Sequence, residues 1–190
     1  MADVASPTSE SVVSAERLAI RGAEARDVHA IMAIDRHAYP TPWSRRMTIE
    51  QVTGTNRTHL VLEKNHEVVG HAGVLFMAGE AHVSTIALAP EVHGRGHGFD
   101  LLLALVRASL AAGCHALTLE VRATNKTALA LYRRFSLAPA GIRRGYYGDN
   151  GEDALVLWSP EFSGDYLDRI SAMRYVHELD VPHQLENPWD

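Results

Sequence analysis

The 190-residue sequence has little cysteine: Cys114 is the only one. One cysteine cannot form an internal disulfide, so disulfide-stabilised scaffolds are excluded and a reducing compartment is expected. The sequence also lacks an uninterrupted apolar run of about 18 residues, the length that a membrane-spanning helix requires. Residues 1–15 have neither the basic start nor the apolar centre of a signal peptide. We therefore expect a cytoplasmic protein without a membrane partner.

A basic excess is missing as well. The formal net charge is −5, with 18 Lys and Arg against 23 Asp and Glu. Residues 161–190 contain seven acidic residues and two arginines, so this segment accounts for the whole excess of negative charge. Such a distribution does not provide the basic face on which direct binding of nucleic acid depends.

The histidines do not form a recognisable metal motif. The sequence has 11 of them, and His93 and His97 are four residues apart, as two metal ligands on one helix would be. The glycines around this pair argue against a helix there, and no carboxylate or cysteine completes a ligand set. No metal site is predicted.

The length and composition predict one folded domain. A chain with 46% hydrophobic and 22% charged residues can bury a proper core, but 190 residues are few for two domains. We expect residues 1–16, rich in Ser, Ala and Glu, to be a disordered N-terminal extension, and residues 17–160 to form the domain. Residues 161–190 are expected to be an acidic C-terminal extension, in which Leu167, Ile170, Met173 and Val176 have the spacing of one amphipathic helix.

Apolar periodicity and turn signals predict an alternation of strands and helices. Strands are expected over residues 18–21, 58–64, 68–77, 80–88, 116–121, 138–147 and 154–158. Helices are expected over residues 25–38, 44–52, 101–112 and 125–135. This order predicts a mixed α/β sheet in a single domain.

Residues 89–98 (APEVHGRGHG) join an expected strand to an expected long helix. Three glycines within five residues allow positive φ and a close approach of the backbone to a ligand. Unpaired N–H groups at a helix start favour an anion, and Arg95 adds a cation, so the loop suits a phosphate or pyrophosphate. A tight turn without a ligand fits the loop alone equally well. The loop matches neither the P-loop ending nor the position and spacing of a dinucleotide fingerprint.

Two side chains near this loop have alternative interpretations. Glu120 shares one face of its expected strand with Thr118 and Arg122, whereas its neighbours on the other face are apolar. In a central strand covered on both faces, Glu120 would be partly removed from water, which strengthens a carboxylate as a base. A salt bridge to Arg122 or another arginine is the alternative. Tyr132 lies on the same helix face as Asn125, seven residues earlier, and is either a core tyrosine or a functional one.

Taken in order, these stretches resemble a known family. Residues 86–98 resemble the acetyl-coenzyme A motif Q/R-x-x-G-x-G/A of the GCN5-related N-acetyltransferases (GNAT). More narrowly, the chain looks like the ribosomal-protein alanine N-acetyltransferases of the RimI type. The matching stretches are LEVRATN (119–125), ALY (130–132), IRRGYY (142–147), EDA (152–154) and PWS (42–44). The resemblance covers about residues 17–158.

The resemblance implies both a fold and a reaction. The fold is a single GNAT domain of the α/β (α+β) class, with a mixed, mostly antiparallel central sheet flanked by helices. The co-substrate is acetyl-CoA, and no metal takes part. The acceptor is the N-terminal α-amine of an alanine-starting small-subunit ribosomal protein, which attacks the thioester directly in a ternary complex. Acetylation of a small amine or a lysine, or a CoA-binding regulatory module without turnover, remain alternatives, and the oligomeric state stays open.

The resemblance also implies roles for individual residues. Glu120 matches the general base and Tyr132 the general acid. Asn125 contacts the cofactor arm. Main-chain groups of Ile86, Ala87 and Leu88 bind the pantetheine amides. The pyrophosphate is held by the backbone of Gly94, Arg95, Gly96, His97, Gly98 and Phe99.

Three residues depart from the family pattern. His93 stands where the motif has Gln or Arg, and Phe99 stands where an arginine is common. Ser136 replaces the glycine that follows the tyrosine helix. We expect the first two to weaken phosphate contact without removing the backbone cradle, and the third to alter the end of the helix.

Overall fold

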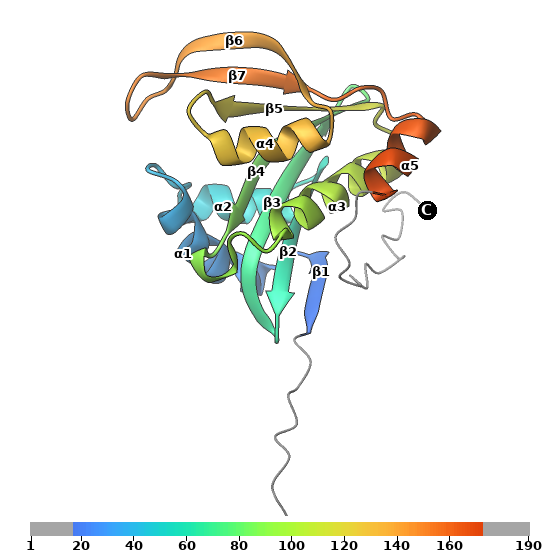
Figure 1. Cartoon of the computed structure of the whole chain (residues 1–190). Helices are drawn as coiled ribbons and strands as arrows, with labels where there is room; N and C mark the ends of the chain where they lie inside the picture. Colours follow the sequence, from blue (N-terminus) through green and yellow to red (C-terminus); the bar gives the residue numbers. More distant parts are fainter. Residues whose placement is uncertain (1–16, 173–190) are drawn as a thin grey trace, which may run out of the picture.

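The structure, a computed structural model that describes residues 17–172, is built on a seven-stranded sheet (Figure 1). The strand order is β1-β2-β3-β4-β5-β7-β6. All neighbouring strands pair antiparallel except β4 and β5, which are parallel. The strands are β1 (Leu18–Gly22), β2 (Arg57–Lys64), β3 (Glu67–Met77), β4 (Glu80–Leu88), β5 (Ala116–Arg122), β6 (Ala138–Tyr147) and β7 (Glu152–Trp158). The predicted fold class is confirmed.

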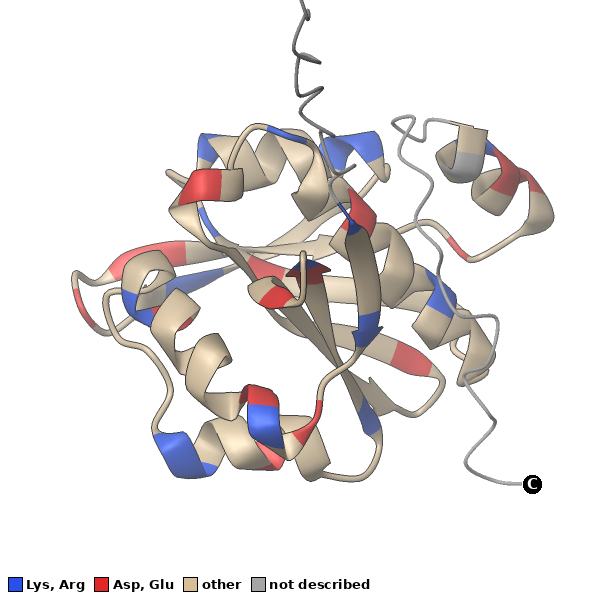
Figure 2. Ribbon diagram, turned by 90° about the horizontal axis from the view of Figure 1, so that it is seen from below, with Lys and Arg blue, Asp and Glu red and all other residues tan. Residues whose placement is uncertain are grey.

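Helices cover both faces of the sheet. Figure 1 shows α3 and α4 in front of the strands and α1 and α2 behind them. The helices are α1 (Val28–Ala38), α2 (Arg45–Thr53), α3 (His97–Ala111), α4 (Lys126–Arg134) and α5 (Gly164–Ala172), with short 3-10 turns at η1 (Ala25–Asp27) and η2 (Pro90–Val92). No helix among residues 17–172 has the length and apolar character needed to cross a membrane. Basic and acidic positions are interspersed over these elements (Figure 2).

Helix α3 is the centre of the core. Leu101, Leu102 and Leu105 are each 0% exposed, and the helix packs on β2, β3, β4 and β5. Fully burying a leucine side chain stabilises a fold by about 1.5–3 kcal/mol. This accounts for the apolar character of α3 on nearly all of its faces.

The start of α3 differs from the sequence-based expectation. The helix begins at His97, not at residue 101, so His97 and Gly98 lie in its first turn. The preceding Gly96 has φ of +88° and serves as the N-cap. The glycines thus do not prevent a helix: one of them makes the left-handed turn that starts it, and Gly98 is accepted in the first turn.

Helices α3 and α4 end in the same way. After α3, the N–H of Gly113 donates to Leu110 O and that of Cys114 to Ser109 O. After α4, Ser136 donates to Arg133 O and Leu137 to Tyr132 O. These paired bonds are the Schellman arrangement, which places one residue in the left-handed conformation. Gly113 has φ of +76° and Ser136 has φ of +56°, so the expected change of the α4 end does not occur.

Helix α5 lies in the segment that the sequence predicts as a C-terminal extension. Its Tyr166 and Ile170 are 4% and 0% exposed and belong to the main core. The Tyr166 hydroxyl donates to Phe135 O at 2.9 Å, which ties α5 to the end of α4. Residues 1–16, Met173 and Val176 lie outside the described residues.

The parallel pair β4 and β5 separates part-way along its length. Pairing runs only from Glu80 opposite Ala116 to His82 opposite Thr118. Beyond His82, β4 continues to Leu88 and stays paired with β3, while β5 continues to Arg122 paired with β7. The two strands therefore diverge, and one edge of β4 has no partner strand among the residues that the structure describes.

Candidate active site

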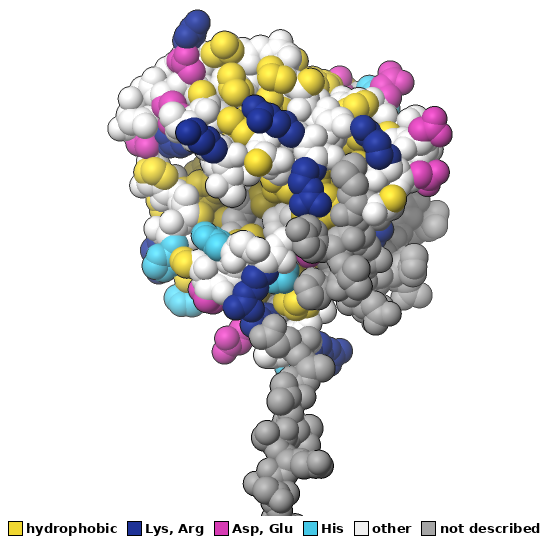
Figure 3. Space-filling model, viewed as in Figure 1, with side chains coloured by type: hydrophobic (Ala, Val, Ile, Leu, Met, Phe, Trp, Pro, Cys, Tyr) yellow, Lys and Arg dark blue, Asp and Glu magenta, His cyan; other side chains and the backbone are white. Residues whose placement is uncertain are grey.

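A cleft of about 650 Å³ lies where β4 and β5 diverge. Its walls come from β4, β5, α1, α4 and the turn between β6 and β7. In the space-filling view the hollow between the upper and lower parts of the molecule shows hydrophobic side chains (Figure 3). Glu120, Asn125 and Tyr132, which the sequence brought together only by motif and helix spacing, all line this one cleft. Trp43, from the loop before α2, lines it as well.

The free edge of β4 leads to the glycine loop. Along this edge, Ile86 O accepts from the Tyr39 hydroxyl at 2.9 Å, and Leu88 O accepts from Nε2 of His93 at 3.0 Å. A carbonyl oxygen has two lone pairs, so both acceptors keep capacity for an additional donor. The side chain of His93, one of the departures from the family pattern, is therefore hydrogen-bonded to the edge of β4.

The glycine loop presents its backbone rather than its side chains. Gly94 has φ of +74°, and no atom lies within 4 Å of where its Cβ would be. Within residues 17–172, the N–H groups of Gly96, His97 and Gly98 donate to no backbone acceptor, as expected at a helix start. These N–H groups and the positive end of α3 form an anion cradle. The residues present thus fit a phosphate or pyrophosphate group.

Phe99, the second departure, is part of the core. It is 2% exposed and packs against Phe135, with ring centroids 4.7 Å apart. The guanidinium of Arg134 lies 4.5 Å from the centroid of the Phe99 ring. A cation is thus present beside the first turn of α3, although it comes from α4.

Glu120 projects from β5 between two basic side chains. Its Oε2 is 2.9 Å from Nε2 of His82 on β4, and its Oε1 is 2.9 Å from a guanidinium nitrogen of Arg143 on β6. The Glu120 side chain is only 7% exposed, against 32% for His82 and 57% for Arg143. The expected partial removal of Glu120 from water and an ion pair with an arginine are therefore both present.

Arg122 is engaged elsewhere. Its guanidinium lies 2.7 Å from Asp149 and 3.1 Å from Glu152, and 3.9 Å from the centroid of the Tyr147 ring. These contacts raise the pKa of Arg122, through the two carboxylates, against the opposing effect of burial. Arg122 therefore fastens the β6–β7 hairpin to the end of β5 and holds Tyr147 and Asp149 at the cleft.

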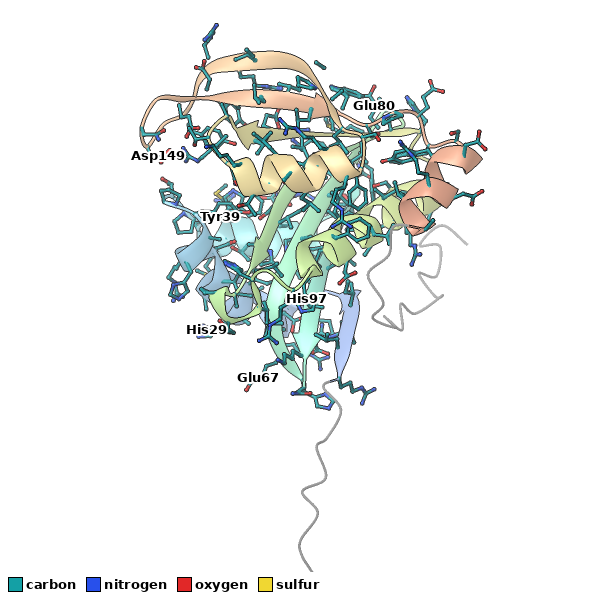
Figure 4. All side chains as sticks on the ribbon, in the orientation of Figure 1. His29, Tyr39, Glu67, Glu80, His97 and Asp149 are labelled. Atoms are coloured by element: carbon teal, nitrogen blue, oxygen red, sulfur yellow. The ribbon has the colours of Figure 1, made fainter. Side chains whose placement is uncertain are left out.

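Two tyrosines with raised pKa values, Tyr39 and Tyr132, line the cleft. Burial raises the pKa of Tyr132, and the nearby Tyr39 and Tyr147 raise it further. Burial likewise raises the pKa of Tyr39 to about 12. Both hydroxyls are therefore protonated at neutral pH. Figure 4 shows Tyr39 in the region between α1 and α4, at the same side of the molecule as Asp149.

A buried polar chain anchors α1 to the sheet. Asp35 Oδ1 lies 2.9 Å from Nε2 of His71, whose Nδ1 is 3.1 Å from Nε2 of His59. All three residues are buried, and burial together with His71 lowers the pKa of His59 to about 3. Among the described residues, no three His, Cys, Asp or Glu side chains are grouped so that they could hold a metal ion. The hydrogen bonds from His59 through His71 instead hold Asp35 in place, and Asp35 is part of the α1 wall of the cleft.

Comparison with known proteins identifies the family. The model of the acetyltransferase (GNAT) family matches residues 28–136. This chain belongs to the GNAT family. The resemblance that the sequence motifs suggested is confirmed.

Among GNAT proteins, similarity is high to ribosomal-protein acetyltransferases. The putative [ribosomal protein bS18]-alanine N-acetyltransferase of Bacillus subtilis is 32% identical over 143 residues, which cover 75% of this chain and 95% of that protein. The crystal structure of the ribosomal-protein-S18-alanine N-acetyltransferase from Escherichia coli superposes with a TM-score of 0.71 at 31% identity, covering 77% and 95% of the two chains. Arabidopsis thaliana NAA60, solved in complex with acetyl-CoA, shares the fold at 16% identity, with a TM-score of 0.69 and coverage of 75% and 98%.

Sequence reasoning missed two cleft residues of this GNAT domain. Tyr39 follows α1 and lies 46 residues before its hydrogen-bond partner Thr85, and His82 lies 38 positions before Glu120. A signal for His82 was present, because the alternation along β4 places His82 on the same partly exposed face as Ser84 and Ile86. Nothing in the sequence, however, specified that this face lies opposite Glu120.

Proposed function

We propose that this chain transfers the acetyl group of acetyl-CoA to the N-terminal α-amine of a protein, namely an alanine-starting small-subunit ribosomal protein. The observation that carries the proposal is the placement of Glu120 and Tyr132 on one cleft, which is also lined by β4, the strand that leads into the glycine loop. The names of the Bacillus subtilis and Escherichia coli relatives, both of which concern alanine on a ribosomal protein, support the acceptor. An acceptor of this kind implies a reaction in the cytoplasm.

The cofactor is proposed to lie along the free edge of β4. Main-chain groups of Ile86, Ala87 and Leu88 would bind the pantetheine amides, as an added strand does. The backbone from Gly94 to Phe99 would hold the pyrophosphate, and Asn125 would contact the cofactor arm. Asn125 already accepts from the N–H of Ala128 at 3.0 Å as the N-cap of α4, so its side chain is fixed at the cleft wall.

Glu120 is proposed as the general base. An α-amine has a pKa near 8 and is mostly protonated at neutral pH, so a proton must leave before the nitrogen can attack. A buried carboxylate on the cleft wall can accept it, directly or through a water molecule. The nitrogen then attacks the thioester carbonyl, which a backbone N–H of the 86–88 segment would polarise.

Tyr132 is proposed as the general acid. Collapse of the tetrahedral intermediate breaks the C–S bond and releases a thiolate, which needs a proton. The raised pKa of Tyr132, caused first by burial, keeps its hydroxyl protonated and available for donation. Direct attack by the amine requires no enzyme nucleophile, and Cys114 is buried and does not line the cleft.

A peptide assay tests the proposal. We expect release of free thiol from acetyl-CoA with a basic peptide that begins with alanine, and mass spectrometry should place the acetyl group on the N-terminus. Matched controls are the same peptide with a blocked N-terminus and an internal lysine, and a small polyamine. Turnover only with lysine or the polyamine would redirect the proposal to those amines. Tight CoA binding without thiol release for any acceptor would instead indicate a regulatory module.

A further inference from the structure

We propose that His82 and Glu120 act together as a two-group base, in which His82 takes the proton from the Glu120 side and passes it to solvent. The inference deepens the proposed acetyl transfer and rests on it. It concerns a side chain that the motif comparison does not include, because His82 lies outside every stretch that carried the family resemblance.

The contact between the two residues follows from the divergence of the strands. His82 and Thr118 are the last paired residues of β4 and β5, and Glu120 lies two positions further along β5 on the same face as Thr118. At the point where the strands part, Nε2 of His82 lies 2.9 Å from Oε2 of Glu120. Both side chains line the cleft. The pair therefore stands at the end of the cleft where the strands begin to separate.

The surroundings of Glu120 argue against its acting alone. Its other oxygen is 2.9 Å from the Arg143 guanidinium, a permanent cation. With Arg143 on one oxygen, the His82 ring on the other oxygen is the neighbour through which a proton on the carboxylate can leave. A neutral imidazole that carries its hydrogen on Nδ1 can accept a proton at Nε2 and release the Nδ1 proton to water. The proton therefore moves from the Glu120 carboxylate through the His82 ring.

The proton balance of the reaction fits a base with two groups. The acceptor starts as an ammonium ion and ends as an amide, so its nitrogen loses two protons while the C–N bond forms. The sulfur gains one proton as the C–S bond breaks, and one proton is released overall. Glu120 and His82 together can take both protons from the nitrogen. One of these protons restores the Tyr132 hydroxyl after it has protonated the sulfur. The other proton passes to solvent.

Exposure indicates the direction in which that proton leaves. The Glu120 side chain is 7% exposed and His82 is 32% exposed, so the ring connects the buried carboxylate with water. Other ionisable groups also face the cleft and influence the pair. Besides Arg143, they are Asp35 and Tyr39 from α1, Arg122 from β5, Tyr132 from α4, and Tyr147 and Asp149 from the hairpin.

Substitution of His82 tests the pair. We expect His82→Gln to lower kcat about tenfold or more, within the range of general-base contributions, and to leave the KM for acetyl-CoA unchanged. The wild-type profile of kcat/KM against pH should show an inflection near the imidazole range that the variant loses. His29→Gln is the matched control, because His29 is exposed on α1 and outside the cleft (Figure 4). It should keep both the rate and the profile.

Chemical rescue separates proton transfer from a merely structural role. Added imidazoles should restore His82→Ala, and the rescue should grow with the basicity of the imidazole used. An acceptor peptide with a less basic α-amine provides a measurement without any variant, since an inflection that belongs to the enzyme keeps its position whereas one that belongs to the amine moves. An inflection that moved fully with the amine would overturn the inference even if the variants failed to fold.

Two results for folded variants would also overturn it: an unchanged pH profile in His82→Gln, or rescue that ignores imidazole basicity. In either case the wild-type enzyme would still acetylate the alanine peptide, so the proposed function would stand. If the wild-type protein acetylated no N-terminus, the proposed function itself would fail.

Discussion

The glycine loop at the end of β4 and the β5–α4 wall of the cleft depend on their residues in different ways. The loop offers main-chain N–H groups, and its side chains are used elsewhere: Phe99 packs in the core and His93 braces Leu88 O. The β5–α4 wall offers the side chains of Glu120 and Tyr132. Side-chain departures from the family pattern are therefore tolerable in the loop. On the β5–α4 wall, replacing the carboxylate of Glu120 or the hydroxyl of Tyr132 should impair the proton transfer that depends on it.

The largest effect should come from Glu120→Gln, which keeps the shape of the side chain and removes the base. We expect kcat to fall by roughly 10²-fold or more, with a changed pH profile. The KM for acetyl-CoA should change little. Glu67→Gln, at the exposed start of β3, is the matched control and should retain wild-type kinetics. Wild-type activity and pH dependence in Glu120→Gln would mean that the base lies elsewhere or that solvent suffices.

Tyr132→Phe should have the next largest effect. The change removes one hydroxyl from the cleft wall, and we expect turnover to fall about tenfold to 10²-fold while cofactor binding is nearly retained. Tyr166→Phe is a useful contrast, because its hydroxyl bonds to Phe135 O within the core. That variant should lose about 1 kcal/mol of stability, measured by thermal unfolding, and keep its kcat. If Tyr132→Phe lost only CoA affinity, the acid role would be wrong.

The order of elements was predictable from the sequence because it depends on local signals. Apolar periodicity gave every strand and helix of residues 18–158, and the Asn125 cap begins α4 as expected. Turn chemistry was equally local: Asn65 and His66 both have positive φ between β2 and β3. The glycine motif located the anion cradle. Such signals need only neighbouring residues.

The geometry of the site was less predictable because it depends on where paired strands stop pairing. Nothing in residues 80–88 or 116–122 indicates that pairing ends at His82 and Thr118, yet this end creates the cleft. The contacts of Tyr39 with Ile86 O and of His82 with Glu120 join segments far apart in sequence. They follow from the strand order, which periodicity alone does not specify.

On the loop side, the sharpest test alters the backbone. Gly96 has φ of +88°, and a side chain in the left-handed region costs about 1–2 kcal/mol. Gly96→Ala should therefore raise the KM for acetyl-CoA by up to about tenfold, since 1.4 kcal/mol corresponds to a tenfold change in affinity. The kcat at saturating acetyl-CoA should be nearly unchanged. Gly22→Ala, where nothing lies within 4 Å of the added Cβ and φ is not positive, controls for loss of a glycine. A fall in kcat alone would contradict the division of roles between the two walls.

The smallest effect concerns how the helices behind the two walls end. Gly113 after α3 and Ser136 after α4 occupy the same position of the same hydrogen-bonded motif, with φ of +76° and +56°. A glycine has no Cβ penalty in this conformation. Ser136→Gly should therefore stabilise the protein by about 0.5–1 kcal/mol, measured by thermal unfolding, without changing kcat.

The reciprocal change supplies the control. Gly113→Ser should destabilise by a similar amount, because nothing lies within 4 Å of the position of its Cβ and only backbone strain is added. If neither variant changed the stability, both helix ends would accept serine and glycine equally well. The left-handed conformation of Ser136 would then not be strained. Opposite changes of similar size in the free energy of unfolding would show that Ser136 lowers the stability of the protein. Ser136 lies at the end of α4, the helix that contains Tyr132. Because the Leu137 bond to Tyr132 O remains in both residue choices, such a cost leaves the position of the proposed acid unchanged.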